Sequence, residues 1–150
     1  MTLTASIGRY GWMKVIDVMT NNPVTIMASE TVGKADELMS ENNIRQIPVV
    51  AGRELIGIVT DRDIRSFLSD ALLADPDARE KALKTGVGDI MTREPLFVAP
   101  DDDLQEAVEL LIEHKYGAIP VVDEAEGLVG IVSYVDVLRC FLNRLQEEST

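Results

Sequence analysis

The chain is poor in the residues that metal, redox and nucleic-acid sites most often need. It has one cysteine and one histidine among 150 residues, which excludes an intramolecular disulfide and any site built from two histidines. Basic residues number 14 against 26 acidic ones, giving a net charge of −12. Sequence-independent binding to nucleic acid or to an anionic membrane needs clustered positive charge, so the composition argues against both partners.

Long apolar runs are also missing. No segment approaches the roughly 20 apolar residues that span a bilayer, and the first 14 residues lack the apolar core of a signal peptide. A single cysteine suits a reducing compartment, so we expect a cytoplasmic protein. The 46% apolar and 27% charged residues are typical of a globular fold.

An internal repeat organises the sequence. Val15–Val50 aligns without gaps with Val87–Val122, at an offset of 72 residues, with 13 identities in 36 pairs. After one extra residue in the second copy the offset becomes 73, and Leu55–Ile64 aligns with Leu128–Val137. The matches fall on prolines, short motifs and apolar positions, which indicates a duplicated fold.

Each copy predicts the same order of elements, β-α-β-β-α. The expected strands are Val24–Ile26, Ile47–Val50 and Leu55–Val59 in the first copy, and Leu96–Val98, Ile119–Val122 and Leu128–Val132 in the second. Ser29 and Asp101 are the expected N-caps of the first helices. About 50 residues are too few for a stable unit. We therefore expect the copies to pack sheet to sheet around a shared core, as one pseudo-two-fold α/β (α+β) domain.

The expected organisation has five parts. They are an N-terminal tail (1–14), a first repeat (15–70), a linker (71–86), a second repeat (87–144) and a C-terminal tail (145–150). The linker predicts a short helix over Asp77–Lys84, with Asp75 as N-cap and Pro76 at its first position. Trp12 could dock on the core or on a partner, and the sequence leaves both open.

One motif, Gly-apolar-apolar-(Thr/Ser)-x-x-Asp, ends the last strand of each copy, at Gly57–Asp63 and Gly130–Asp136. As a capping box, its hydroxyl would cap the helix while its acid accepts a backbone N–H. As a nucleotide site, its helix N–H groups would suit a phosphate and its carboxylate two ribose hydroxyls. The glycine would let a ligand or another backbone approach closely. The motif alone favours the cap.

The whole pattern resembles the CBS domain, named after cystathionine β-synthase. The resemblance rests on DVMT-x-x-P from Asp17 and DIMT-x-x-P from Asp89, on IPVV from Ile47 and from Ile119, and on GIVTDRDI and GIVSYVDV. It covers about 15–65 and 87–139. It implies a tandem CBS pair of the kind that often binds adenine nucleotides. Since little other sequence remains for a catalytic, channel or transporter domain, we expect a stand-alone pair.

The resemblance also implies which residues bind the ligand. Asp63 and Asp136 would hold the ribose, and Thr60 and Ser133 would lie near phosphate, with Asp61 and Arg62 beside the first site. The adenine would contact Thr20 and Val24 with Ile44, Arg45 and Gln46 in one copy, and Thr92 and Leu96 with Tyr116, Gly117 and Ala118 in the other. No catalytic or metal-binding residue is expected, and His114 and Cys140 are interpreted as structural.

The two copies differ in positive charge. The first offers Arg45, Arg62 and Arg65, whereas the second has Gly117 and Val135 in place of Arg45 and Arg62. In a molecule of net charge −12, an anion needs such local help. We expect the Asp63 site to bind phosphate better, and the Asp136 site to prefer a less charged ligand or to stay empty.

Taken together, the sequence predicts a non-enzymatic regulatory module with no obligatory cofactor. Its ligand would be an adenine nucleotide (AMP, ADP or ATP) in preference to S-adenosylmethionine, bound in clefts between the repeats, and a shift in conformation would signal to an unidentified protein partner. A homodimer through Leu138, Phe141 and Leu142 is expected, as the resemblance suggests. The alternative is a ligand-free scaffold whose Thr/Ser-x-x-Asp motifs are only helix caps.

Overall fold

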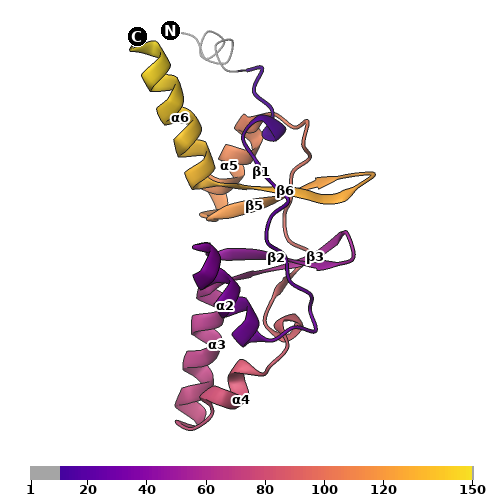
Figure 1. The fold of residues 1–150 in the computed structure, drawn as a ribbon, viewed down its shortest axis with the longest axis vertical. Helices are drawn as coiled ribbons and strands as arrows, with labels where there is room; N and C mark the ends of the chain where they lie inside the picture. Colours follow the sequence, from indigo (N-terminus) through magenta and orange to yellow (C-terminus); the bar gives the residue numbers. More distant parts are fainter. Residues whose placement is uncertain (1–10, 150) are drawn as a thin grey trace. The chain divides into compact units, whose positions relative to one another are not determined.

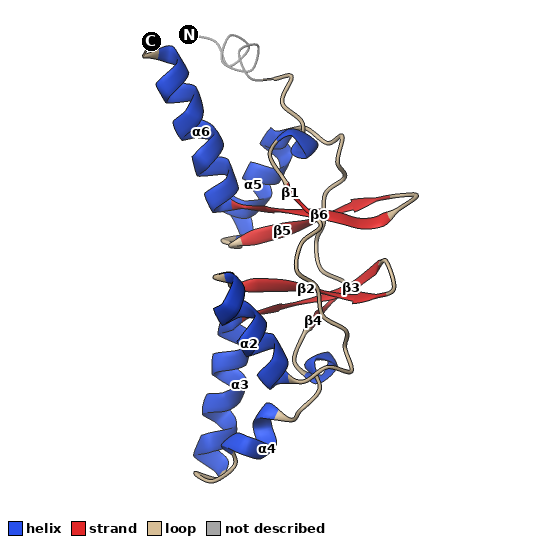
Figure 2. Cartoon of the chain, in the orientation of Figure 1, coloured by secondary structure: helices blue, strands red, loops and turns tan. Residues whose placement is uncertain are grey.

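The computed structural model describes residues 11–149, which divide into two compact units. Unit 1 comprises Met1–Asn22 with Leu96–Thr150, and unit 2 comprises Pro23–Pro95. Each unit contains one three-stranded antiparallel sheet (Figure 1). In each, the helices lie on one side of the sheet (Figure 2). The expected α/β architecture of two similar halves is confirmed.

Unit 2 has strand order β2-β3-β4. Its elements are α2 (Val32–Asn42), β2 (Gln46–Ala51), β3 (Glu54–Thr60), α3 (Asp61–Ala74), α4 (Arg79–Leu83), the 3-10 turn η2 (Val87–Asp89) and β4 (Thr92–Arg93). The extended stretch predicted at Val24–Ile26 makes only a single bridge, from Ile26 to Val49.

Unit 1 has the matching order β5-β6-β1. Its elements are the 3-10 turn η1 (Val15–Asp17), β1 (Thr20–Asn21), α5 (Leu104–His114), β5 (Ala118–Asp123), β6 (Gly127–Ser133) and α6 (Tyr134–Glu148). The stretch predicted at Leu96–Val98 bridges Val121 from Val98. The helix α6 continues through most of the expected C-terminal tail.

The third strand of each sheet comes from the other sequence copy. Thr20, from the first copy, lies opposite Ile131 in β6, and Thr92, from the second copy, lies opposite Ile58 in β3. The segments leading into these strands cross as well, because Val15 is buried in the core of unit 1 and Val87 in the core of unit 2. The units of the fold are therefore not the repeats of the sequence.

Close backbone approach explains the glycine of the shared motif. A Cβ built on Gly57 would lie 2.9 Å from the carbonyl oxygen of Thr92, and one on Gly130 would lie 2.9 Å from that of Thr20. A side chain at Gly57 would also collide with the sulfur of Met91, which precedes Thr92, and one at Gly130 with the sulfur of Met19, which precedes Thr20. Of the two roles considered for this glycine, the structure selects the approach of another backbone.

Each unit has its own hydrophobic core. In unit 2 it includes the apolar faces of α2 and of the two long strands, with Ile26, Ile47, Val59 and Ile64 almost completely buried. In unit 1 the corresponding positions are occupied by Val98, Ile119 and Val132. The core that we expect the two copies to share stays a prediction.

Two predicted N-caps are wrong by two residues. The first helix of each copy follows Thr31 or Asp103, not Ser29 or Asp101. The reason is a turn just before the helix, in which the carboxylate of Glu30 accepts the N–H of Met27 and that of Asp102 accepts the N–H of Ala99. Because Glu30 and Asp102 form these turns, the helices begin only after Thr31 and Asp103.

The linker helix is shorter than predicted. Asp75 ends α3, since its own N–H donates to the carbonyl of Ala71. Its carboxylate accepts the N–H of Asp77, and its carbonyl accepts the N–H of Ala78, so a turn precedes α4. The helix begins at Arg79 because Asp75 serves this turn instead of a cap.

Within residues 11–149, every helix is too short or too polar to cross a bilayer.

We predict that Gly57→Ala and Gly130→Ala each destabilise the fold by about 1–3 kcal/mol, the usual cost of forcing extra atoms into a packed site. The added methyl would push away the crossing strand of one unit. Urea unfolding of both variants measures the change. Unchanged stability in either variant would contradict the close approach of that strand.

Candidate functional site

The shared motif forms a capping box in both units. In unit 2 the Thr60 hydroxyl accepts the N–H of Asp63 at 3.1 Å, and the Asp63 carboxylate accepts the N–H of Thr60 at 2.9 Å. In unit 1 Ser133 and Asp136 make the same two bonds, at 3.1 and 2.9 Å. The capping interpretation of the motif is confirmed.

Each of the two acids keeps hydrogen-bond acceptor capacity beyond its capping bond. A carboxylate has two oxygens and about four acceptor positions, and the cap uses Oδ2 of each acid. Among the described residues, Oδ1 of Asp63 accepts no hydrogen bond and forms no ion pair. The capping box therefore fixes a half-buried acid at the tip of a helix while leaving acceptor capacity for a ligand.

Several predicted residues gather at this tip in unit 2. The N–H of Asp61 donates to the carbonyl of Arg45 at 2.9 Å, which holds Arg45 beside the start of α3. Gln46 lies opposite Thr60 in the sheet. The side chains of Arg45 and Arg62 are exposed, and Arg65 lies 3.5 Å from the Asp61 carboxylate. Three arginine residues thus lie on or next to the start of α3.

In unit 1 the N–H of Tyr134 donates to the carbonyl of Gly117 at 3.1 Å, the counterpart of the Arg45 contact. Ala118 lies opposite Ser133, but its side chain is buried and faces the core. The ring of Tyr116 is exposed and stacks on His114 with centroids 5.1 Å apart. This stack was not predicted.

The acid of unit 1 has partners that the acid of unit 2 does not have. The Thr20 hydroxyl donates to Asp136 Oδ1 at 3.2 Å, and Arg139 Nη1 lies 3.7 Å from the same oxygen. Within the described residues, neither Thr92 nor a basic side chain contacts Asp63 in this way. A ligand hydroxyl would have to compete for Asp136 but not for Asp63.

The predicted grouping of the adenine residues stays a prediction, although two of its threonines lie in the other unit from the residues grouped with them. Thr20 was grouped with Ile44 and its neighbours, and Thr92 with Tyr116 and its neighbours. The crossed strands place Thr20 in unit 1 with Asp136, and Thr92 in unit 2. Val24 and Leu96 lie in the units expected, unit 2 and unit 1 respectively.

The crossing also moves a positive charge. Arg93 belongs to the second sequence copy, but it lies in β4 opposite Gly57 and donates to the carbonyl of Gly88 at 3.4 Å, both in unit 2. Unit 1 keeps His114 and Lys115 at the end of α5, and Arg139, whose guanidinium is paired with the acid. The crossed strand thus adds Arg93 to unit 2, which already contains Arg45, Arg62 and Arg65.

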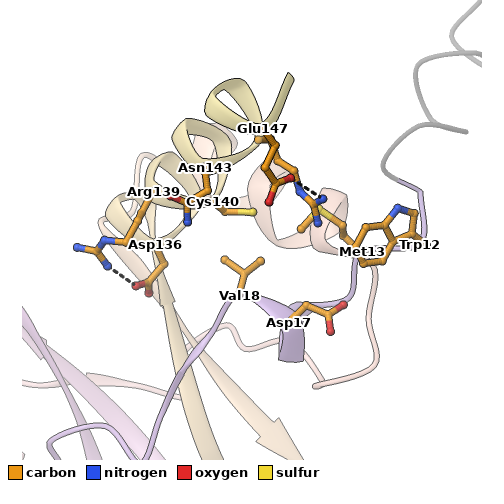
Figure 3. A pocket seen from close by; sticks show the side chains of 10 residues that line it. Trp12, Met13, Asp17, Val18, Asp136, Arg139, Cys140, Asn143 and Glu147 are labelled. Carbon is orange, nitrogen blue, oxygen red and sulfur yellow. Dashed lines mark hydrogen bonds and ion pairs between the residues drawn. The ribbon is translucent and has the colours of Figure 1, made fainter. Parts of the chain in front are cut away.

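A groove in unit 1 was missed by the sequence analysis. It has a volume of about 450 Å³ and lies between residues 12–18 and α6. Figure 3 shows the sulfur of Cys140 pointing into this space. The lining residues are Trp12, Met13, Asp17, Val18, Asp136, Arg139, Cys140, Asn143, Arg144 and Glu147. The available signal was Cys140 itself, which stands where the first copy has the larger Phe67.

Charged side chains away from the two helix tips form several surface ion pairs among the described residues. In the part of the chain that the structure describes, no three His, Cys, Asp or Glu side chains cluster as metal ligands would. Among residues 11–149, Lys14 has a shifted pKa: its hydrogen bond to Asp103, with the attraction of that carboxylate, raises the pKa above the usual 10.5. This exposed pair ties the N-terminal segment to the start of α5.

Comparison with known proteins identifies the pattern. Residues 15–70 and 87–143 match the model of the CBS domain. The protein YhcV of Bacillus subtilis, a CBS domain-containing protein, is 33% identical over 135 residues, which is 90% of this chain and 88% of YhcV. Inosine-5'-monophosphate dehydrogenase of Korarchaeum cryptofilum is 36% identical over 76% of this chain, but the match spans only 21% of that enzyme.

Solved structures are similar over almost the whole chain. AcuB from Vibrio cholerae has a TM-score of 0.76 at 33% identity, covering 92% of this chain and 97% of its own. CBSX2 in complex with AMP has a TM-score of 0.74 at 33% identity, covering 87% and 96%. The CBS domain pair of protein MJ0100, in complex with 5'-methylthioadenosine and S-adenosyl-L-methionine, has a TM-score of 0.72 at 26% identity, covering 88% and 98%.

We predict that Thr60→Ala and Ser133→Ala each destabilise the protein by about 1 kcal/mol, because each removes the acceptor for one helix N–H. Thermal unfolding measures the change. Ser69→Ala, at an exposed interior position of α3, is the control and should leave stability almost unchanged. Equal stability of the cap and control variants would contradict the capping role.

Proposed function

This chain belongs to the family of CBS-domain proteins, and we propose that it is a regulatory module that binds an adenine nucleotide beside Asp63 in unit 2 and a related ligand beside Asp136 in unit 1. The observation that carries the proposal is the capping box, which holds an acid with spare acceptor capacity at a helix tip. The AMP complex of CBSX2 and the adenosyl ligands of MJ0100 support this class of ligand.

Each part of a nucleotide has a chemical counterpart at these tips. The free oxygen of Asp63 would accept hydrogen bonds from a ribose diol. The N–H groups of Asp61 and Asp63 are used by Arg45 and Thr60, so the N–H of Arg62 at the start of α3, with the Thr60 hydroxyl, would face a phosphate. In unit 1 the exposed ring of Tyr116 offers a surface on which a base could stack.

The two sites would differ in the ligand they prefer. Three arginines on or next to the first turn of α3 favour a phosphorylated nucleotide beside Asp63. Beside Asp136 the Thr20 hydroxyl and Arg139 already engage the acid, and Gly117 and Val135 stand at the positions of Arg45 and Arg62. This site would take a less charged adenosyl compound, such as the thioethers bound by MJ0100, or stay empty.

Binding would act through a partner and not through turnover. A ligand shifts a conformational equilibrium only by the difference in its affinity for the two states, so signalling needs a partner that distinguishes those states. We propose no catalytic residue and no obligatory cofactor. The cytoplasmic location expected from the single cysteine stays a prediction.

We predict that Asp63→Asn weakens AMP and ATP binding by about tenfold to a hundredfold, the loss of one or two charge-assisted hydrogen bonds. The asparagine oxygen can still accept the Thr60 N–H, so the cap survives while the acceptor for the diol is replaced by an NH₂ group. Asp136→Asn should change ATP binding much less. Isothermal titration calorimetry measures both, with the exposed Asp70→Asn on α3 as control.

The calorimetric outcomes distinguish the two interpretations of the motif, a ligand site and a helix cap. Equal losses in Asp63→Asn and Asp136→Asn would contradict the difference between the sites. Absence of heat with AMP, ADP, ATP and S-adenosylmethionine at millimolar concentration would favour the alternative, a ligand-free scaffold whose motifs are only helix caps.

We also propose that the chain forms a homodimer through α6. One side of this helix exposes Leu138, Phe141, Leu142 and Leu145, each between 46% and 58% accessible. These residues recur at helical spacing and form an apolar stripe of the kind that self-association buries. A second copy would supply a matching stripe by two-fold symmetry.

We predict that Leu142→Glu yields a monomer, because it places a charge in the middle of the stripe. Sedimentation velocity over a range of protein concentrations measures the state. The control is Gln146→Glu, which adds the same charge at an exposed position of α6 next to the stripe. A variant Leu142→Glu that sediments like the wild type would refute this interface.

A further inference from the structure

The acid at the tip of α6 is largely buried by groups of its own chain. The side chain of Asp136 is 12% exposed. Its Oδ2 accepts the N–H of Ser133, and the Thr20 hydroxyl lies 3.2 Å from Oδ1 and 3.4 Å from Oδ2. Thr20 therefore stands within hydrogen-bond distance of both carboxylate oxygens. A ligand hydroxyl has little room to reach Asp136 unless Thr20 moves away.

The group that Thr20 presents to this acid is an alcohol, and so is each hydroxyl of a ribose diol. At 3.2 Å the bond is longer than the usual range for O–H···O bonds, about 2.5–3.0 Å. Thr20 is also exposed, so the bond lies where a ligand can approach it. Exchange of one hydroxyl for another keeps the carboxylate satisfied, and a better-placed ligand hydroxyl would win.

Unit 2 lacks this contact although it has the same pair of residues. Thr92 corresponds to Thr20 at the offset of 72, and it lies in β4 opposite Ile58 as Thr20 lies in β1 opposite Ile131. Within the described part of the chain, Thr92 makes no hydrogen bond to the acid of its unit. The two units thus show the same motif with the hydroxyl engaged and with it released.

Thr20 belongs to a strand with few other ties. The strand β1 consists of Thr20 and Asn21, each paired with one residue of β6. The next bond along the chain, from the N–H of Asn22 to the carbonyl of Val129, is 3.3 Å long. The side-chain bond to Asp136 is therefore a substantial part of what holds this short segment, and its loss should let the strand open more often.

We propose that Thr20 occupies the place of a ligand hydroxyl at Asp136, so that a ligand with a ribose diol must displace it and thereby loosens β1. This inference rests on the proposed function, since it takes an adenosyl ligand beside Asp136 as given. The family resemblance implies instead that Thr20 contacts the adenine. A contact residue strengthens binding, whereas a competitor weakens it, so the sign of one substitution decides between the two roles.

The first test is adenosine binding to Thr20→Val, which keeps the shape of the side chain and removes its hydroxyl. Isothermal titration calorimetry uses the full chain in an Asp63→Asn background, so that the heat reports mainly on Asp136. Adenosine should bind about threefold to tenfold more tightly than to the background alone, the equivalent of one modest hydrogen bond. Thr20→Ser retains the hydroxyl and should restore the background affinity.

A control substitution of the same kind is Thr25→Val, at an exposed position of unit 2, which should leave adenosine binding unchanged.

The second test measures the strand itself. In the same background without ligand, NMR hydrogen exchange of the Asn22 amide should be severalfold faster in Thr20→Val than in Thr20→Ser. Saturating adenosine should accelerate this exchange when Thr20 is present and leave it unchanged in Thr20→Val. A ligand that simply protected its site would slow the exchange instead.

Each outcome has a distinct meaning. Weaker adenosine binding in Thr20→Val would overturn the inference and make Thr20 a direct ligand contact. Equal binding, or Asn22 exchange that does not respond to Thr20→Val, would overturn it as well. Absence of adenosine heat in every protein, the wild type included, would contradict the proposed function, and the inference would fall with it.

Discussion

Two close backbone contacts hold this architecture together: β1 over Gly130 and β4 over Gly57. Each brings a segment of one sequence copy into the sheet of the other, and each requires a position without a side chain. The methionine before each crossing strand lies against the same glycine, so the DVMT and DIMT motifs and the later glycines form one contact. The crossing also carries Thr20 to Asp136 and Arg93 to unit 2, so residues of both copies contribute to each unit.

The acid at each tip has a structural role and, in our proposal, a binding role. As a cap it satisfies a backbone N–H that the start of the helix would otherwise leave unpaired. That bond also fixes the rotamer of the acid, so a ligand would meet a carboxylate that is already in place. The two interpretations weighed for the motif are therefore compatible.

Much of the fold could be predicted from local pattern. The apolar runs identified all four long strands, and the Thr/Ser-x-x-Asp spacing identified both capping boxes, because these features depend on neighbours in the sequence. The crossing of Thr20 and Thr92 could not be predicted, because an alignment of two copies carries no information on which copy a strand pairs with. The N-caps at Thr31 and Asp103 were missed for a related reason: several acids and hydroxyls compete in one short turn, and hydrogen-bond geometry decides among them. The α6 groove depends on the absence of volume at Cys140, which a pattern of apolar residues does not show.

The crossed strands have a consequence for how such a chain could arise. A single ancestral repeat could not have completed its own sheet, since the strand that lies over its glycine comes from another repeat. Its edge would have stayed open, and an open edge invites pairing with a second molecule. Two identical chains exchanging their leading strands would have satisfied both edges at once, as in domain swapping. Fusion of the two genes would then have joined an existing dimer into one polypeptide, after which the halves were free to diverge in charge.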